Sequence, residues 1–309
     1  RRMDSVKTFS IKRKRNKRSL EKNILDTRSK GERWIFAVAF AVLGIHCLTL
    51  LIPVVWMLMS ILKTSEEYLF GNPFALPSEW LFSNFWEAFD SLHTTDGVTF
   101  FEMLFNSIWY TVLATFLSVF MPATTGYVMS KYKFRGREFI FAVAVTAMIL
   151  PIVGTSAAYL KFMMDTGMYD TPLYVVWQFL GGFTGQFLVY YGYFRSVSWE
   201  YAEAAKIDGA GHFSIYFKIM LPQAVPVLLT YTIVNFITHW NEYQNVLLYL
   251  PSFPTLAAGL FSYGEIAKRS GNFPQYFAGL FISMIPTLLL FAFFSKRIMG
   301  SVSLGGLKG

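Results

Sequence analysis

The sequence is poor in charge, in cysteine and in the short motifs of soluble enzymes. Only 15% of its 309 residues are Asp, Glu, Lys or Arg, whereas about a quarter is usual in a soluble domain. The single cysteine, Cys47, excludes an intrachain disulfide. No lysine follows a glycine, so the Gly-Lys-Ser/Thr of a Walker A phosphate loop is absent. These features exclude a disulfide scaffold, a soluble enzyme and ATP hydrolysis by a Walker A loop in this chain.

Patterns for metal binding and for catalysis are missing as well. Gly-x-Ser-x-Gly, His-Glu-x-x-His and Cys-x-x-Cys do not occur. His239 and Glu242 are one helical turn apart, but they supply two ligands where a zinc site needs three or four. We therefore predict no metal, no catalytic residue and no cofactor held by the chain itself. A membrane-embedded enzyme stays open as an alternative, although it requires a clustered catalytic set.

Long uncharged runs take the place of these motifs. Six of them are long and apolar: 34–62, 103–130, 139–160, 171–194, 219–241 and 270–295. A helix needs about 20 apolar residues to cross the hydrocarbon core, and backbone groups in lipid must be paired within the protein. The sequence therefore predicts an all-α membrane protein with six transmembrane helices.

Positive charge is distributed unevenly between the two sides that six spans define. The tail 1–33, the loops 131–138 and 195–222 and the C-terminal tail contain all but four of the 27 Lys and Arg residues. Because positive charge is retained on the cytoplasmic side, we expect both termini to be cytoplasmic. The net charge of +8 then requires no nucleic-acid partner. The basic run Lys12–Arg18 is most simply an anchor to anionic lipid, with a nucleic-acid patch as the alternative.

One outer connection stands out by its composition. Residues 248–274 contain three prolines and three glycines. Both residue types interrupt regular structure. We expect an outer loop here that dips into the membrane.

The cytoplasmic loop 196–222 has the most specific pattern. Ser198 is a candidate N-cap for a short helix, with Glu203 near its first turn. Gly209 can end that helix because glycine accepts left-handed backbone geometry, and a second helical stretch follows over 213–221. This pattern predicts a helix–turn–helix on the cytoplasmic surface, whose small alanines admit another backbone. A plain connection between spans fits the composition equally well.

The spacing within this loop resembles a known family. Glu203-Ala204-Ala205, three residues, Gly209, nine residues and Ile219-Met220-Leu221-Pro222 are similar to the Glu-Ala-Ala loop of binding-protein-dependent ABC importer permeases. Asn106-Ser107 and Lys133–Gly136 also look like this family, and Trp240-Asn241-Glu242 is similar to its carbohydrate permeases. The ending 300–309 resembles the second permease subunit of maltose-type transporters. The resemblance covers roughly residues 34–309.

The resemblance implies a type I importer architecture: a basic cytoplasmic tail over 1–33 and a permease domain over 34–309. The loop would be a coupling helix for a cytoplasmic ATPase, with contacts carried over to Glu203, Ala204, Ala205, Gly209, Ile219, Leu221 and Pro222. The implied partners are a homologous second permease, two ATPase subunits that bind ATP and Mg²⁺, and an extracytoplasmic solute-binding protein. The implied function is carbohydrate import, of oligosaccharides above all, across the bacterial cytoplasmic membrane.

The fifth run carries a polar stripe at helical spacing. Glu242 is the only formal charge between residues 219 and 264, and charges within a membrane usually face a cavity or a partner. The candidate substrate path comprises Asn235, His239, Trp240, Asn241, Glu242 and Tyr243, with Gln178 and Gln186 in the fourth run as further candidates. The alternative is that the Asn and His side chains hold helices together and that Glu242 lies in water at the outer end.

An ATP-independent secondary transporter or channel is the main alternative function. Such proteins carry several intramembrane charges or inverted repeats. Only Glu242 is evident here.

Overall fold

The computed structural model describes residues 30–94, 97–150 and 154–305. Its regular elements are all helices, and no strand occurs within those ranges. The chain divides into two compact units, residues 1–59 and 60–309. The basic run Lys12–Arg18 and most of the predicted tail 1–33 lie outside the described residues. The all-α prediction is confirmed for the described part of the chain.

Helix α2 (Lys30–Ile61) forms most of what is described in the first unit. Its segment Gly31–Ile61 is long and apolar enough to cross a membrane. Apolar side chains occur on all of its sides rather than along one stripe. A helix of this kind is suited to lipid and not to a water-exposed surface.

Helix α5 (Phe100–Lys131) is the central element of the second unit. It begins with a capping box, in which Thr99 Oγ1 accepts the Glu102 N–H and Glu102 accepts the Thr99 N–H. Capping boxes satisfy N–H groups that a helix leaves without partners. The start of α5 is therefore determined by local sequence.

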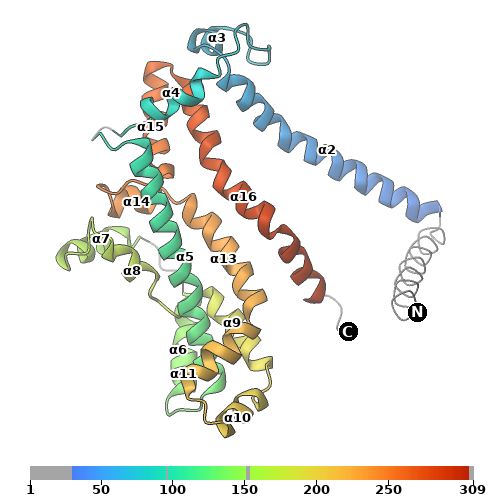
Figure 1. Cartoon of the computed structure of the whole chain (residues 1–309), viewed down its shortest axis with the longest axis vertical. Coiled ribbons are helices and arrows are strands. Elements are labelled where there is room, and N and C mark those ends of the chain that lie inside the picture. The colour runs from blue at the N-terminus through green and yellow to red at the C-terminus, as the bar shows by residue number, and fades with distance from the viewer. Residues whose placement is uncertain (1–29, 95–96, 151–153, 306–309) are drawn as a thin grey trace, which may run out of the picture. The chain divides into compact units, whose positions relative to one another are not determined.

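Two helices pack along α5 on the side of its last turns. They are α9 (Gly185–Ser196) and α13 (Val225–Trp240). Gly126 makes the contact with α9 close: a Cβ there would lie 2.8 Å from the Tyr190 Cβ and 2.9 Å from the Tyr191 nitrogen. Small residues allow membrane helices to approach in this way. The short helices α10 and α11 lie at this end of α5, and α3, α4 and α15 lie at the other (Figure 1).

The first end of α5 contacts α4 (Ser83–Ser91) and α15 (Leu256–Ser270). Helix α16 (Phe273–Gly305) packs on both of these and on α3 (Ser65–Phe70). The prediction of a loop over 248–274 was wrong in part, because α15 occupies most of it. Pro254 precedes the N-cap Thr255, where a proline does not interrupt the helix. Gly259 lies directly against Met103, so its small size serves the packing of helices and not a turn.

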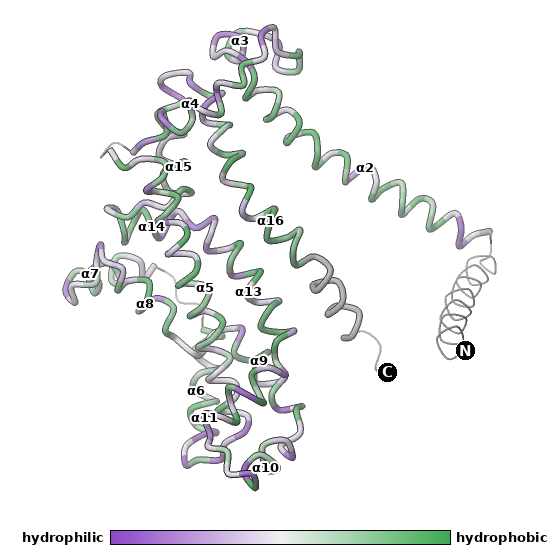
Figure 2. Tube along the Cα trace, viewed as in Figure 1, coloured by the Kyte–Doolittle hydropathy of each residue, from purple (hydrophilic) through white to green (hydrophobic). Residues whose placement is uncertain are grey.

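The six apolar runs do not all form single helices. Three helices of the described chain are long and apolar enough to cross a membrane: Gly31–Ile61, Phe100–Lys131 and Phe273–Phe294. A fourth candidate is the pair His212–Gln223 and Val225–Trp240, which is bent by 76°. Figure 2 shows hydrophobic residues along α2, α5, α13 and α16, and hydrophilic ones around α3 and α10.

The third and fourth runs are each divided between two helices. The third forms α6 (Arg137–Ile149) and α7 (Ser156–Asp165), and the fourth forms α8 (Leu173–Phe179) and α9. Between α8 and α9, Gly182 lies so close to α5 that a Cβ would be 2.0 Å from the Thr125 Oγ1. The length and hydropathy of the fourth run give no sign of this close contact, so the sequence predicted an unbroken span.

We predict that Gly126→Ala destabilises the chain, because its new methyl group collides with backbone and Cβ atoms of α9. The expected loss is roughly 1–3 kcal/mol, as for overpacked cores, measured by unfolding of the purified protein in mixed micelles. The matched control is Gly192→Ala on α9, which has open space around it and gains only helix propensity. Equal effects of the two changes would contradict the close contact.

Candidate functional site

The loop between α9 and α13 folds as two short helices joined by a glycine turn. Helix α10 (Glu200–Ile207) begins where Ser198 Oγ accepts the Glu200 N–H at 3.2 Å. Gly209 ends it with φ of +82°, which L-residues with side chains rarely adopt. Helix α11 (His212–Ile215), a π-helical turn (Tyr216–Met220) and α12 (Leu221–Gln223) follow. The two helices and the turn are as predicted, but the N-cap of α10 is Trp199, without a side-chain capping bond, rather than Ser198. The cytoplasmic position of the loop stays a prediction.

One face of this loop is buried against α5 and α9. Ala202 and Ile215 are fully buried in a cluster with Tyr127, Phe194 and other side chains of these helices. The Tyr216 ring stacks on that of Tyr127 at 4.7 Å, and its hydroxyl lies 2.7 Å from the Thr124 Oγ1. The loop is therefore packed on the helix bundle as part of its core.

Polar contacts add to this anchoring at the end of α5. Lys131 Nζ donates to the Val197 carbonyl, and both Lys131 and Lys206 lie near the face of the Trp199 ring, at 6.0 and 5.2 Å. The Tyr132 hydroxyl lies 2.9 Å from His212 Nδ1. Cation–π contacts of this kind contribute about 0.5–1 kcal/mol when exposed. These contacts hold the loop against the last turn of α5.

The opposite face of the loop is exposed and partly apolar. Glu203, Ala204 and Gly209 are exposed, and Ala205 is half-buried. Beside them, Ile207 and Phe213 expose 87% and 82% of their surface, and the Tyr201 ring is exposed as well. Large exposed apolar side chains on a short polar segment mark an interaction site, for a protein or for a membrane surface. Sequence reasoning did not name Tyr201, Ile207 and Phe213 as part of this surface, because large apolar side chains are ordinarily expected to be buried.

The remaining residues of the motif lie elsewhere. Ile219 and Leu221 are half-buried, and Leu221 packs against the buried cluster. Pro222 is exposed at the start of α12. The seven motif residues thus divide into an exposed group at α10 and an inner group before α13.

Three of the predicted path residues bond to neighbouring helices of the same chain. Asn235 and Gln186 exchange amide hydrogen bonds of 2.8 and 3.1 Å. His239 Nε2 lies 3.1 Å from the Ser118 Oγ, and Trp240 Nε1 donates to the Ser283 carbonyl at 2.9 Å. Asn235, His239 and Trp240 are all buried. Hydrogen bonding within the chain accounts for their polar groups.

The other three lie where α13 ends. Asn241 is exposed and bonds back to the Ile237 carbonyl. Glu242 is half-buried, and its Oε1 accepts the Asn245 N–H at 3.0 Å. The Tyr243 ring stacks on Phe261 at 4.6 Å. The first residues of the polar stripe therefore contact neighbouring helices, whereas its last residues lie at the more exposed end of α13.

A cavity of about 430 Å³ lies beside this open end, between α7, α8 and α14 (Gln244–Tyr249). Its lining combines hydroxyl, amide and aromatic groups: Thr155, Ser156, Ala158, Tyr159, Gln178, Asn245 and Tyr249. The Tyr159 hydroxyl donates to Gln178 Oε1 at 2.6 Å. Among the described residues, the Gln178 amide nitrogen and the Asn245 side chain donate no hydrogen bond. Sequence reasoning named Gln178 but missed Tyr159 and Tyr249, because no motif marks them.

The fold and the helix–turn–helix define a multi-pass helical membrane protein. Residues 123–303 match the family of binding-protein-dependent transport system inner membrane components, and the chain belongs to this family. It is 29% identical over 282 residues to the diacetylchitobiose uptake system permease protein NgcG of Streptomyces coelicolor, with 90% of each chain covered. It is 25% identical to the melibiose/raffinose/stachyose import permease protein MelC of Bacillus subtilis, covering 91% of this chain and 99% of that one.

A solved structure has the same fold. It is a bacterial ABC transporter involved in the import of the acidic polysaccharide alginate, with a TM-score of 0.73 and 24% identity. The match covers 87% of this chain and 98% of that one.

We predict that the Asn235–Gln186 pair stabilises the contact between α13 and α9. A double-mutant cycle with Asn235→Ala and Gln186→Ala is expected to give a coupling free energy of roughly 0.6–2 kcal/mol for unfolding in mixed micelles, the range for such bonds in membranes. As a control, Asn235→Ala with Gln178→Ala should give none, because these two residues share no hydrogen bond. Absence of coupling in the first pair would favour a role in the substrate path instead.

Proposed function

We propose that the chain is the transmembrane permease subunit of an ATP-driven carbohydrate importer. Family membership supports this, as do relatives named for diacetylchitobiose uptake and for melibiose, raffinose and stachyose import. The observation that carries the proposal is the loop around α10. Its inner face is built into the core beside α5 and α9, while its outer face exposes Glu203, Ile207 and Phe213.

Such a loop is suited to passing force between proteins. An ATPase subunit that contacts Glu203, Ala204, Ala205 and Gly209 would move α10, and the buried cluster would pass the movement to α5 and α9. Ile219, Leu221 and Pro222 lie between this surface and α13, so the fifth span moves with it. ATP and Mg²⁺ would be bound by the ATPase pair and not by this chain.

The proposed topology has six spans with both termini in the cytoplasm of a bacterial cell. Helices α6 with α7, and α8 with α9, would each make one divided span, and α12 with α13 the bent fifth span. Non-helical backbone at membrane depth is tolerated where protein or a water-filled cavity surrounds it. Residues 34–309 would form the permease domain, with the tail 1–33 on anionic lipid.

The proposed assembly contains a homologous second permease, two ATPase subunits and an extracytoplasmic solute-binding protein. Another solved structure of this fold is a bacterial alginate ABC transporter in complex with an alginate pentasaccharide-bound periplasmic protein, with a TM-score of 0.59. Oligosaccharides are the proposed cargo, because the relatives cited above are named for the uptake of such sugars.

We place the sugar contacts at the open end of α13 and in the adjoining cavity. Sugar hydroxyls need hydrogen-bonding groups, which Gln178 and Asn245 provide, and sugar rings stack on aromatic faces such as Tyr159. Asn241, Glu242 and Tyr243 lead from α13 to this cavity. Asn235, His239 and Trp240 would maintain the helix packing that shapes the path.

We predict that Glu203→Lys uncouples ATP hydrolysis from the sugar-loaded binding protein. The change reverses an exposed charge at the proposed ATPase contact, so stimulated ATPase activity of the reconstituted complex should fall while assembly persists. Glu200→Lys, the same charge reversal at another exposed position of α10, is the control and should retain stimulation, because Glu200 is not among the proposed ATPase contacts. Full stimulation in Glu203→Lys would remove the main support for the proposed function.

Gly209→Val should impair coupling through the backbone. The φ of +82° imposes a strain of about 1–2 kcal/mol on a residue with a side chain, which turns α10 away from its contact. Stimulated ATPase activity is expected to drop roughly 5–30-fold, the factor that corresponds to this strain. Gly211→Val is the control, since Gly211 has an ordinary extended backbone with open space around it.

Gln178→Leu and Asn245→Leu should weaken sugar handling without uncoupling. Each removes a hydrogen-bonding group worth about 1–3 kcal/mol to a buried polar ligand, so we expect a raised KM for oligosaccharide uptake into proteoliposomes. Gln244→Leu, a neighbour outside the cavity lining, is the control. An unchanged KM in both cavity variants would place the sugar path elsewhere.

A further inference from the structure

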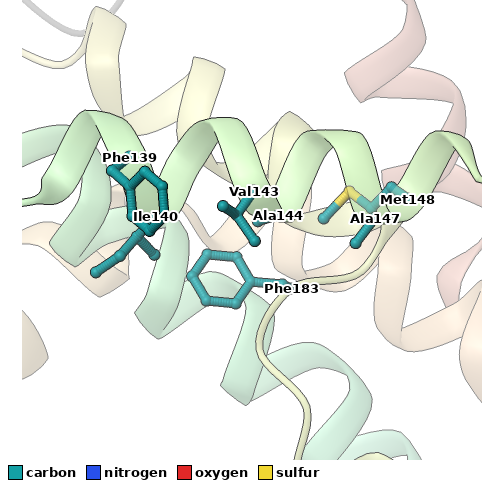
Figure 3. Close-up of a pocket in the computed structure, with 7 residues that line it drawn as sticks. All are labelled: Phe139, Ile140, Val143, Ala144, Ala147, Met148 and Phe183. Carbon is teal, nitrogen blue, oxygen red and sulfur yellow. The ribbon is translucent and has the colours of Figure 1, made fainter.

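An apolar groove runs along the outward face of α6. Its volume is about 420 Å³. Figure 3 shows Phe139 and Ile140 at one end, Val143 and Ala144 in the middle, Ala147 and Met148 at the other end, and Phe183 opposite them. Phe183 comes from the connection between α8 and α9. No polar side chain lines the groove, so water and sugar are poor occupants.

A flank of α6 next to the groove packs on α9. Phe141 packs on Phe187 and Tyr191 of α9, with ring centroids 6.0 and 4.8 Å apart. The groove side remains open, and Phe139 and Val143 expose 74% and 51% of their surface. Among the described residues of the second unit, the lining opposite α6 comes from Phe183 alone.

A cluster of positive charge adjoins one end of the groove. Lys133 and Arg135 are exposed in the short loop that leads into α6, and Phe139 follows four residues after Arg135. Arg137 is paired with Glu138 and is not counted among the free charges. Basic groups beside a lipid-facing helix attract anionic headgroups on the cytoplasmic side.

The length of the groove matches one leaflet. From Phe139 to Met148 the helix rises roughly 14 Å at 1.5 Å per residue, whereas half of the hydrocarbon core is about 15 Å thick. A lipid with its headgroup at Lys133 and Arg135 would therefore place one acyl chain along the groove. A helix of a partner protein would instead need to continue across the whole membrane.

We propose that the groove binds one acyl chain of an anionic glycerophospholipid of the cytoplasmic leaflet, with its phosphate held by Lys133 and Arg135. The inference rests on the proposed topology, in which the 131–138 loop is cytoplasmic. The bound lipid would fill the open side of α6 and hold the divided third span in place.

The test compares phosphatidylglycerol with phosphatidylcholine of the same acyl chains. The full-length chain is purified with its complex, and the retained lipid is counted by native mass spectrometry after titration. Lys133→Gln with Arg135→Gln should weaken phosphatidylglycerol binding roughly 10–30-fold, because the variant loses the attraction of two cations for the anionic headgroup. Arg195→Gln with Lys218→Gln removes two exposed charges from the same proposed side and should leave binding unchanged.

A second arm fills the groove. Ala147→Phe places a ring on its exposed floor and should remove the bound lipid, whereas Ala142→Phe on the same helix lies outside the lining and should retain it. Because Ala147→Phe could disturb folding, unmodified protein is also labelled with phosphatidylglycerol that carries a photoreactive group on its acyl chain. Labelled peptides should contain 139–148 and residue 183.

Four outcomes would overturn the proposal. The first three are equal retention of the two lipids, an equal loss of binding in both charge variants, and photolabelling confined to other segments. The fourth is cross-linking of Ala147→Cys to the second permease, which would show that a protein covers the groove. Lipid retention needs neither ATP nor sugar, so its failure leaves the Glu203→Lys result intact, and loss of coupling leaves lipid retention intact.

Discussion

The close contact of α5 with α9 at Gly126 determines much of the remaining structure. It brings Tyr127 of α5 beside Tyr190 and Phe194 of α9. These aromatic side chains are the surface on which the loop around α10 is packed. Without a residue as small as glycine at this crossing, the helices would separate and the cluster under the loop would lose its shape. A contact inside the bundle thus positions a surface at its end.

The sequence was informative where chemistry is local. The uncharged runs predicted membrane helices, and Ser198 and Gly209 predicted the limits of α10 to within a few residues. Both predictions depend on neighbours along the chain, through helix length, capping and left-handed backbone geometry. The same reasoning did not predict the helix breaks within 139–160 and 171–194. At the second break Gly182 lies against Thr125, which is far away in the sequence.

The residues of the candidate site also differ in how far the sequence could predict them. The motif at Glu203 to Gly209 could be predicted, because its spacing is characteristic of a family. The exposure of Ile207 and Phe213 could not, because both would be buried in an average fold. The polar stripe of α13 was predicted as one surface, yet Asn235 and His239 bond to α9 and α5 while Glu242 lies near an open end. Periodicity gives a face of a helix, and only its neighbours decide what that face contacts.

The π-helical turn Tyr216–Met220 has a consequence for how this segment can vary. A π-turn accommodates one residue more than an α-helix over the same rise. Deleting a single residue there would restore α-helical winding and leave the side chains on either side of the turn on their present faces. Leu221 would then keep its place against the buried cluster. A deletion within an α-helical part of the same segment would instead rotate every following side chain by about 100° about the helix axis. The π-turn is therefore the place between Gly209 and Pro222 where the loss of one residue is tolerated best.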